Sequence, residues 1–224
     1  MKRLQTGLLL VGLLIVSLGL QAAESNIRFG LKSSLNISRH WSSEELSGKG
    51  YSVTAENRTT FALGGLIAWR LSRRFHLQPE IYYIKKGSKQ ILTVDTLPIG
   101  PIKATYSLGY IEIPVLLKAY IKGDQELLGT HLVAGPYLSL LADDKYTIKN
   151  SYLGESESGI TGLRGTDYGL IFGLGLDVNG TSTRFVFDYR FSLGLVELAL
   201  PTGPGLPEIE LRNQCHMFVL EVIL

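Results

Sequence analysis

The sequence contains a single cysteine, Cys215, among its 224 residues. One cysteine cannot form an internal disulfide, so the fold must be stabilised by hydrogen bonds and by burial. Long apolar runs are also missing after residue 22, where no stretch of 18 apolar residues occurs. Because a membrane-spanning helix needs about 20 such residues, this part of the chain is not expected to cross a membrane as a helix.

Charge is scarce as well, since only 19% of the residues are charged and 45% are hydrophobic. That composition is too apolar for a disordered chain. The 22 basic residues exceed the 20 acidic ones by two, and the first two basic residues are Lys2 and Arg3. Without these two, the basic and acidic residues balance at 20 each. The sequence therefore gives no argument for a nucleic-acid partner.

The N-terminal segment has the pattern of a secretory signal peptide. Lys2 and Arg3 precede the uncharged stretch 7–20, and the small residues Ala22 and Ala23 follow it. An uncleaved membrane anchor is the alternative, but a stretch of about 14 residues is short for a span. We predict a cleaved signal peptide at residues 1–22 and one exported domain at residues 23–224.

The exported part alternates apolar and polar residues with a period of two. Successive side chains of a strand point to opposite faces, so each alternating run predicts a β-strand. Most runs reach the roughly 9 to 11 residues that a tilted strand needs to cross a membrane. The runs cover residues 27–38, 60–71, 75–83, 110–121, 131–140, 167–178, 184–194 and 212–224.

The links between these runs alternate in length. Long links at 40–58, 86–104, 143–164 and 196–211 alternate with short links at 72–74, 123–129 and 179–183. Outer-membrane barrels have short periplasmic turns and longer loops on the outside. We therefore predict an all-β fold: an eight-stranded antiparallel up-and-down transmembrane β-barrel. It should lie in the outer membrane of a Gram-negative cell envelope, with both termini in the periplasm.

One long link carries further strand-like pattern. Residues 91–94 and 104–110 flank a proline-containing tip, so the third and fourth strands are expected to continue beyond the membrane as a protruding hairpin. This hairpin and the loop with Glu155 and Glu157 are candidate binding surfaces, although a solvated loop without a partner is the simpler interpretation.

The bulky side chains of the runs indicate which face meets lipid. Eight strands enclose an interior that is only just wide enough for side chains. Rows of Phe, Leu and Ile would not all fit inside, whereas the opposite face, rich in glycine and short polar residues, would. We expect outer-membrane lipid around the barrel. A soluble lipocalin-like barrel with the reverse orientation is the alternative.

Charged residues of both signs fall on the face predicted to line the lumen. Buried charges are tolerated when they are paired, so we predict an internal salt-bridge network that plugs the barrel. A proton or ion path is the alternative interpretation. The predicted members of the network are Arg28, Lys32, Arg70, Glu80, Glu112, Lys118, Asp167, Asp177, Asp188 and Arg190.

Several segments, taken in order, resemble a known family. FGLKSSLNIS (29–38), LQPEIYYIKKGSK (77–89), YIEIPVLLKAY (110–120) and DYGLIFGLGLDV (167–178) resemble strands of the porin-like outer-membrane β-barrel family, which includes PorT-type proteins. The resemblance implies the outer membrane protein beta-barrel domain fold and contact with the barrel-assembly machinery during biogenesis. Most members have no defined activity, and one branch assists protein secretion. The resemblance thus implies a structural, binding or accessory role without a wide pore. A narrow channel for small solutes is the alternative.

The sequence shows no pattern typical of an active site. The four histidines, His40, His76, His131 and His216, are scattered and lack metal-ligand spacing. The glycine-rich GLGL at 173–176 lies inside a predicted strand with no helix after it, which excludes a nucleotide-binding loop. We expect no catalytic residue, cofactor or metal.

A lipid-modifying barrel enzyme is the less favoured alternative. It would use His131 with Ser139, or His216 with Ser192.

Overall fold

The computed structural model describes residues 26–41, 51–94, 100–121, 127–150, 154–159, 165–200 and 209–224. All strand pairs in these ranges are antiparallel. Among the same residues, no helix is long and apolar enough to cross a membrane. The predicted signal peptide lies outside the described residues.

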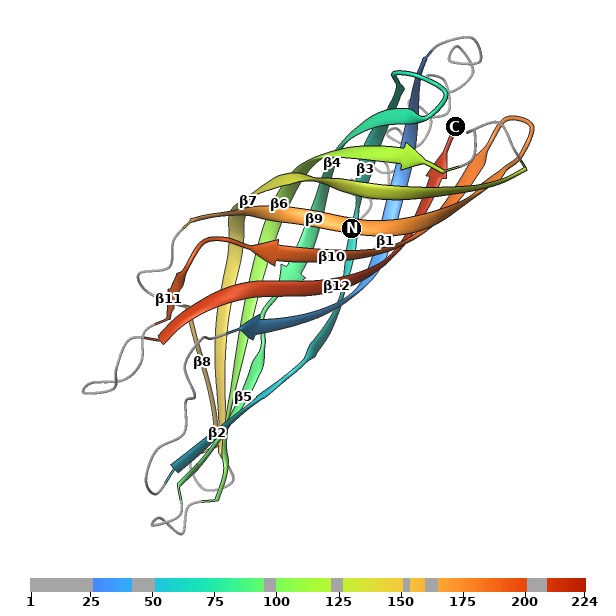
Figure 1. Ribbon diagram of the computed structural model, residues 1–224. Coiled ribbons are helices and arrows are strands. Elements are labelled where there is room, and N and C mark those ends of the chain that lie inside the picture. The colour runs from blue at the N-terminus through green and yellow to red at the C-terminus, as the bar shows by residue number, and fades with distance from the viewer. Residues whose placement is uncertain are drawn as a thin grey trace, which may run out of the picture.

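Eight strands form a closed ring (Figure 1). Leu35 of the first strand pairs with Phe61 on one side and with Phe218 on the other, so the first and last strands close the barrel. Closure leaves no strand of the ring with an unpaired edge, as lipid requires. The predicted eight-stranded antiparallel barrel is confirmed. The ring order is β1 (Ile27–Trp41), β3 (Arg58–Arg70), β4 (Phe75–Lys86), β6 (Ile102–Tyr120), β7 (Leu128–Asn150), β9 (Thr166–Asn179), β10 (Arg184–Gly194) and β12 (Ile209–Ile223).

The short turns and the two described ends of the chain lie at the same end of the barrel. Leu71 N donates to Phe75 O in one turn, and Gly180 N donates to Thr183 O in another. At this end Leu224 N also donates to Phe29 O, which joins the last residue to the start of β1. We call this end the turn side and the opposite end the mouth.

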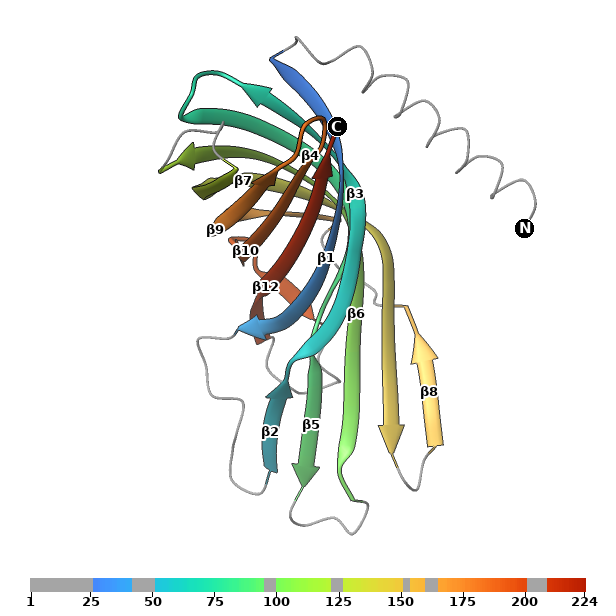
Figure 2. The same cartoon turned by 90° about the vertical axis from the view of Figure 1, so that its right-hand side faces the viewer.

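The sheet of the ring continues beyond the mouth as a projection built on the extended ends of β6 and β7 (Figure 2). Three short strands complete it: β2 (Tyr51–Glu56), β5 (Lys89–Val94) and β8 (Gly154–Ser158). Its strand order is β2–β5–β6–β7–β8. The register between β6 and β7 shifts between Gly109 and Tyr110, at the level where these strands leave the ring. We call this structure the projecting sheet. A further short strand, β11 (Leu198–Leu200), pairs with β12.

The projecting sheet confirms one expectation and corrects two. Pairing of β5 with β6 gives the predicted hairpin. The links at 40–58 and 143–164, however, are not wholly loop, because they contain β2, the last part of β7 and β8. The apolar and polar alternation is weak there because a sheet outside the membrane does not have to present an apolar face to lipid.

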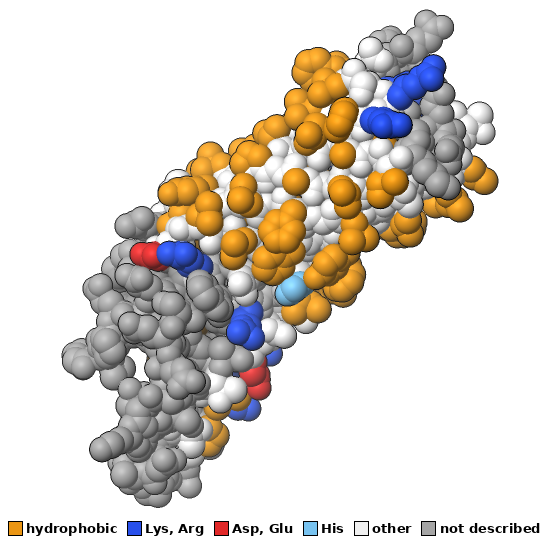
Figure 3. All heavy atoms as spheres, viewed as in Figure 1, with side chains coloured by type: hydrophobic (Ala, Val, Ile, Leu, Met, Phe, Trp, Pro, Cys, Tyr) orange, Lys and Arg blue, Asp and Glu red, His pale blue; other side chains and the backbone are white. Residues whose placement is uncertain are grey.

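The outer wall of the ring is apolar. Outward side chains such as Phe61, Leu63 and Leu174 are exposed to 74%, 68% and 57%. Hydrophobic side chains cover the barrel wall in Figure 3, whereas charged ones gather toward the two ends. Inward side chains on the same strands are buried, many of them polar or charged. The bulky face therefore points outward, as predicted for a membrane barrel.

Candidate functional site: the charged lumen

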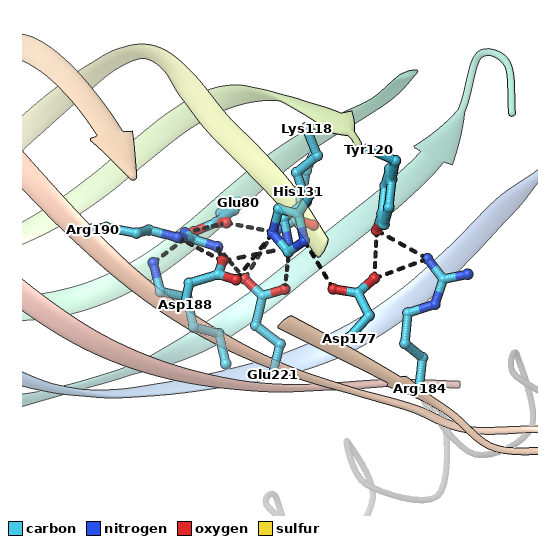
Figure 4. Close-up of polar contacts among 11 residues, drawn as sticks. Glu80, Lys118, Tyr120, His131, Asp177, Arg184, Asp188, Arg190 and Glu221 are labelled. Atoms are coloured by element: carbon cyan, nitrogen blue, oxygen red, sulfur yellow. Dashed lines mark hydrogen bonds and ion pairs between the residues drawn. The ribbon is translucent and has the colours of Figure 1, made fainter. Parts of the chain in front are cut away.

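Charged side chains from opposite walls meet inside the barrel (Figure 4). Arg190 of β10 is the centre of this arrangement. Its Nη1 lies 2.7 Å from Glu80 Oε1, its Nε lies 2.9 Å from Asp188 Oδ2, and its Nη2 contacts Glu221. Strands β4 and β10 are four places apart in a ring of eight, so the Glu80–Arg190 contact spans the diameter.

A second contact also spans the diameter. Lys118 of β6 donates to Glu221 Oε2 of β12 at 2.9 Å, and these strands are again four places apart. Lys118 Nζ is also 3.5 Å from Asp188 Oδ2. Lys32 joins the same group through Glu80 Oε2 at 2.6 Å. All of these side chains are almost completely buried.

His131 lies between two aspartates nearer the turn side. Its Nδ1 is 2.9 Å from Asp177 Oδ1, and its Nε2 is 3.0 Å from Asp188 Oδ1. Asp177 also accepts a hydrogen bond from the Tyr120 hydroxyl at 2.6 Å and lies 3.6 Å from Arg184. The imidazole thus links the central charges to Asp177, Tyr120 and Arg184 nearer the turn side.

These residues form one cluster, which we call the turn-side cluster. It holds four Lys or Arg cations and four carboxylates. His131 faces a carboxylate oxygen with each of its two ring nitrogens, and it can donate to both only as an imidazolium. Pairing of opposite charges is what allows them to be buried together. The members are Lys32, Glu80, Lys118, His131, Asp177, Arg184, Asp188, Arg190 and Glu221.

A separate mouth-side cluster lies toward the projecting sheet. Glu112 accepts hydrogen bonds from Tyr82 and Ser139 and also contacts Lys86. Asp167 lies at the same level, two strands along the ring from Glu112, and its Oδ2 accepts from Asn213 Nδ2 at 2.9 Å. Lys86 Nζ is 4.0 Å from the same Asp167 oxygen. The mouth-side cluster therefore holds two carboxylates and one ammonium group.

Glycine makes room for the turn-side cluster. A Cβ added at Gly175 would lie 2.0 Å from Asp188 Oδ1 and 2.6 Å from the His131 ring. A Cβ added at Gly173 would lie 2.2 Å from the backbone oxygen of Tyr189 on β10. The glycine-rich GLGL segment thus has a packing role in the lumen.

Eight of the ten charged residues named from the sequence are buried in the two clusters, and the structure brings them together. The remaining two, Arg28 and Arg70, are only half-buried near the turn side. They lie near the ends of their strands, where inward side chains reach solvent.

Four further members were missed by the sequence analysis: Lys86, His131, Arg184 and Glu221. The alternation of β12 already places Glu221 opposite Leu220 and Val222, so its inward position was predictable. Lys86 is the last residue of β4, whereas the alternating pattern ends at residue 83 and predicts a link from residue 86 onward.

The histidines do not form an active site among the described side chains. Ser139 donates to Glu112, whereas His131 contacts only aspartates among its ion-pair partners. His216 lies on the outer surface beside Tyr189, with 2.7 Å between Nδ1 and the hydroxyl, while Ser192 is buried on the opposite face. No group of three His, Cys, Asp or Glu residues in the described part of the chain is arranged to hold a metal ion.

The projecting sheet has one charged and one aromatic face. On the face that continues the outer wall, Lys145 pairs with Glu157 at 2.7 Å and Lys149 with Glu155 at 2.8 Å. On the face that continues the lumen, the rings of Tyr106 and Tyr146 lie 4.8 Å apart. Burial raises the pKa of Tyr106 above its ordinary value.

A closed eight-stranded ring with an apolar outer wall and a lumen of buried, paired charges defines an outer-membrane β-barrel. The chain belongs to the family described as the outer membrane protein beta-barrel domain, whose profile matches residues 21–199. The family expected from the sequence segments is confirmed. A bacterial outer-membrane location follows from this family. No curated protein sequence matches the chain.

Solved structures of outer-membrane barrels are similar to the fold. OprG from Pseudomonas aeruginosa is 12% identical with a TM-score of 0.50, and the match covers 88% of this chain and 94% of that one. Neisserial surface protein A is 15% identical with a TM-score of 0.45 (87% and 96% covered). Ail of Yersinia pestis is 11% identical with a TM-score of 0.42 (88% and 98% covered). At these identities the similarity with OprG concerns the fold alone.

Proposed function

We propose that this protein is a closed-lumen outer-membrane barrel with a structural, binding or accessory role, and that it is not a pore. The observation that carries this proposal is the pair of contacts, Glu80–Arg190 and Lys118–Glu221, that span the diameter of the ring. Both are shorter than 3 Å and completely buried. A solute would have to break several paired charges to pass, which costs several kcal/mol for each ion left unpaired.

The projecting sheet is the part of the protein that we propose carries the specific role. It extends the wall from the mouth, and all five residues of β8 are exposed. Functional residues concentrate on loops and extensions that a rigid scaffold positions. An accessory role in secretion would place its contacts on this sheet. Outer-membrane lipid around the apolar wall and the barrel-assembly machinery during biogenesis are the other partners that we propose.

Conductance tests the closed lumen. In planar bilayers the purified protein should give no single-channel steps. A variant in which Glu80, Arg190 and Glu221 are all replaced by serine should conduct if it folds, because the central contacts are then removed. If the wild-type protein gives single-channel current steps, and these substitutions change the conductance of the steps, the protein is instead a narrow channel.

Labelling of cysteines tests the proposed orientation. Cys215 is buried and should not react, so single cysteines can be introduced without background. Thr93→Cys on the projecting sheet should react with a membrane-impermeant maleimide in intact cells. Arg73→Cys in a short turn should react only after the outer membrane is permeabilised. The reverse pattern would contradict periplasmic termini.

We propose no catalytic activity. Neither serine–histidine pair named from the sequence is assembled, since Ser192 and His216 face opposite sides of the wall. The variants His216→Ala and Ser192→Ala should leave the lipid profile of the outer membrane unchanged. A change in that profile with either variant would argue for an enzyme.

A further inference from the structure

The mouth-side cluster has a charge and a donor set that the turn-side cluster lacks. We infer that it binds a small, hard cation of the sodium class, held by oxygen atoms of Asp167, Asn213 and Tyr110.

The first argument is charge balance. Lys86, Glu112 and Asp167 are all 0% exposed, and together they carry one positive and two negative charges. Lys86, Tyr82 and Ser139 all donate to Glu112, so the single ammonium group of the cluster pairs with Glu112 rather than with Asp167. A buried carboxylate without a close counter-charge is costly. The net charge of −1 matches one monovalent cation.

The second argument is the position of Asp167 relative to its neighbours. Its Oδ2 is 4.0 Å from Lys86 Nζ and accepts only from Asn213 at 2.9 Å and Tyr137 at 3.3 Å. Its Oδ1 has no hydrogen-bond partner among the described residues. One oxygen of a completely buried carboxylate is therefore left for a ligand.

Two more buried oxygen atoms belong to residues that interact with Asp167. The amide of Asn213 donates to Asp167 through Nδ2, and its Oδ1 has no hydrogen-bond partner in the described part of the chain. The Tyr110 hydroxyl lies near Asn213 but outside good hydrogen-bond geometry. Asn213 is 3% exposed and Tyr110 is 0% exposed, so solvent does not satisfy these atoms.

Glycine leaves space beside this oxygen. A Cβ added at Gly194 would lie 3.2 Å from both Asp167 Oδ1 and Asn213 Cβ. Carboxylate, carbonyl and water oxygens are the ligands of hard cations, whereas thiolates and imidazoles favour transition metals. The donor set therefore selects a hard cation.

The test measures cation-dependent stability of the full folded protein. Urea midpoints are compared in sodium chloride, choline chloride and calcium chloride at matched ionic strength, since choline is too large for the site. The wild-type midpoint should be higher in sodium than in choline, because a ligand that binds only the folded state stabilises it. Asp167→Asn should abolish this difference, and Tyr110→Phe, which removes one oxygen, should reduce it. Glu157→Gln on the projecting sheet is the matched control and should retain it.

Three results would overturn the inference. The first is a wild-type midpoint that is equal in all three salts. The second is a sodium effect that persists in Asp167→Asn. The third is a midpoint in choline that rises as the pH falls while sodium has no effect, because Asp167 would then hold a proton. A calcium effect larger than the sodium effect and lost in Asp167→Asn would support the site with a divalent occupant. If Asp167→Asn fails to fold, two other measurements test the inference. Tyr110→Phe should reduce the sodium effect on the urea midpoint, and the wild-type protein should broaden the sodium-23 resonance. None of these results depends on whether the barrel conducts.

Discussion

Arg190 and Glu80 are 110 residues apart in the sequence and 2.7 Å apart across the diameter of the barrel. Both side chains are completely buried. Because this contact joins opposite walls, it links the packing of the lumen directly to the closure of the ring.

The variant Arg190→Met should lower the free energy of unfolding by about 3 to 5 kcal/mol, because three buried carboxylates, those of Glu80, Asp188 and Glu221, each lose one of their two Lys or Arg cations. Urea unfolding in lipid vesicles, followed by tryptophan fluorescence, measures this loss. The matched control is Lys149→Met, whose exposed partner Glu155 makes the pair worth less than about 1 kcal/mol. Equal losses in the two variants would mean that the lumen network does not stabilise the barrel.

The variant Gly175→Ala should destabilise the barrel by roughly 1 to 3 kcal/mol, as overpacking of a tight interior does. The added methyl group would meet Asp188 and His131. Gly65→Ala is the control, since the nearest atom to its added Cβ is a backbone oxygen 3.7 Å away. The same urea experiment compares the two. A tolerated Gly175→Ala would show that the contact between His131 and Asp188 is looser than the structure indicates.

Two adjacent tyrosines provide a test of the mouth-side cluster. Tyr82 is 2% exposed and donates to Glu112, whereas Tyr83 is 39% exposed on the outer wall. Tyr82→Phe should cost about 1.5 to 3 kcal/mol, because a hydrogen bond to a buried charge is lost. Tyr83→Phe should change the stability by no more than about 0.5 kcal/mol. If Tyr83→Phe costs as much as Tyr82→Phe, the assignment of inward and outward faces on β4 is wrong.

The apolar wall predicts a sensitivity to charge that depends on position. Leu174→Arg, in the middle of β9, should cost about 2 to 4 kcal/mol, because the guanidinium would face the centre of the bilayer. Thr93→Arg on the exposed face of the projecting sheet should cost little. Vesicle refolding yields and urea midpoints measure both. A tolerated Leu174→Arg would mean that this part of the wall does not contact lipid.

Much of the barrel could be predicted from the sequence, because alternation along one strand is a local property. The run 184–194 coincides with β10, and the outward position of Phe187 follows from its place in that run. The identity of the lumen face could be predicted for the same reason, including the glycines at 173 and 175.

The ends of the strands could not be predicted where they leave the membrane. The last part of β7, up to Asn150, carries Lys145 and Lys149 on one face and Tyr146 on the other. Water accepts both kinds of side chain, so the local pattern no longer separates strand from loop.

The sequence by itself determined the number of barrel strands, the face of each strand that meets lipid and the mixture of charges inside. Only the tertiary structure decided which charges meet. The contacts of Arg190 with Glu80 and of Lys118 with Glu221 depend on the register of every strand around the ring. Pairing across a closed barrel is a property of all eight registers together, and no single segment carries it. The same closure separates the turn-side cluster from the mouth-side cluster, where Asp167 Oδ2 lies 4.0 Å from Lys86 Nζ, its ion-pair partner in the described part of the chain.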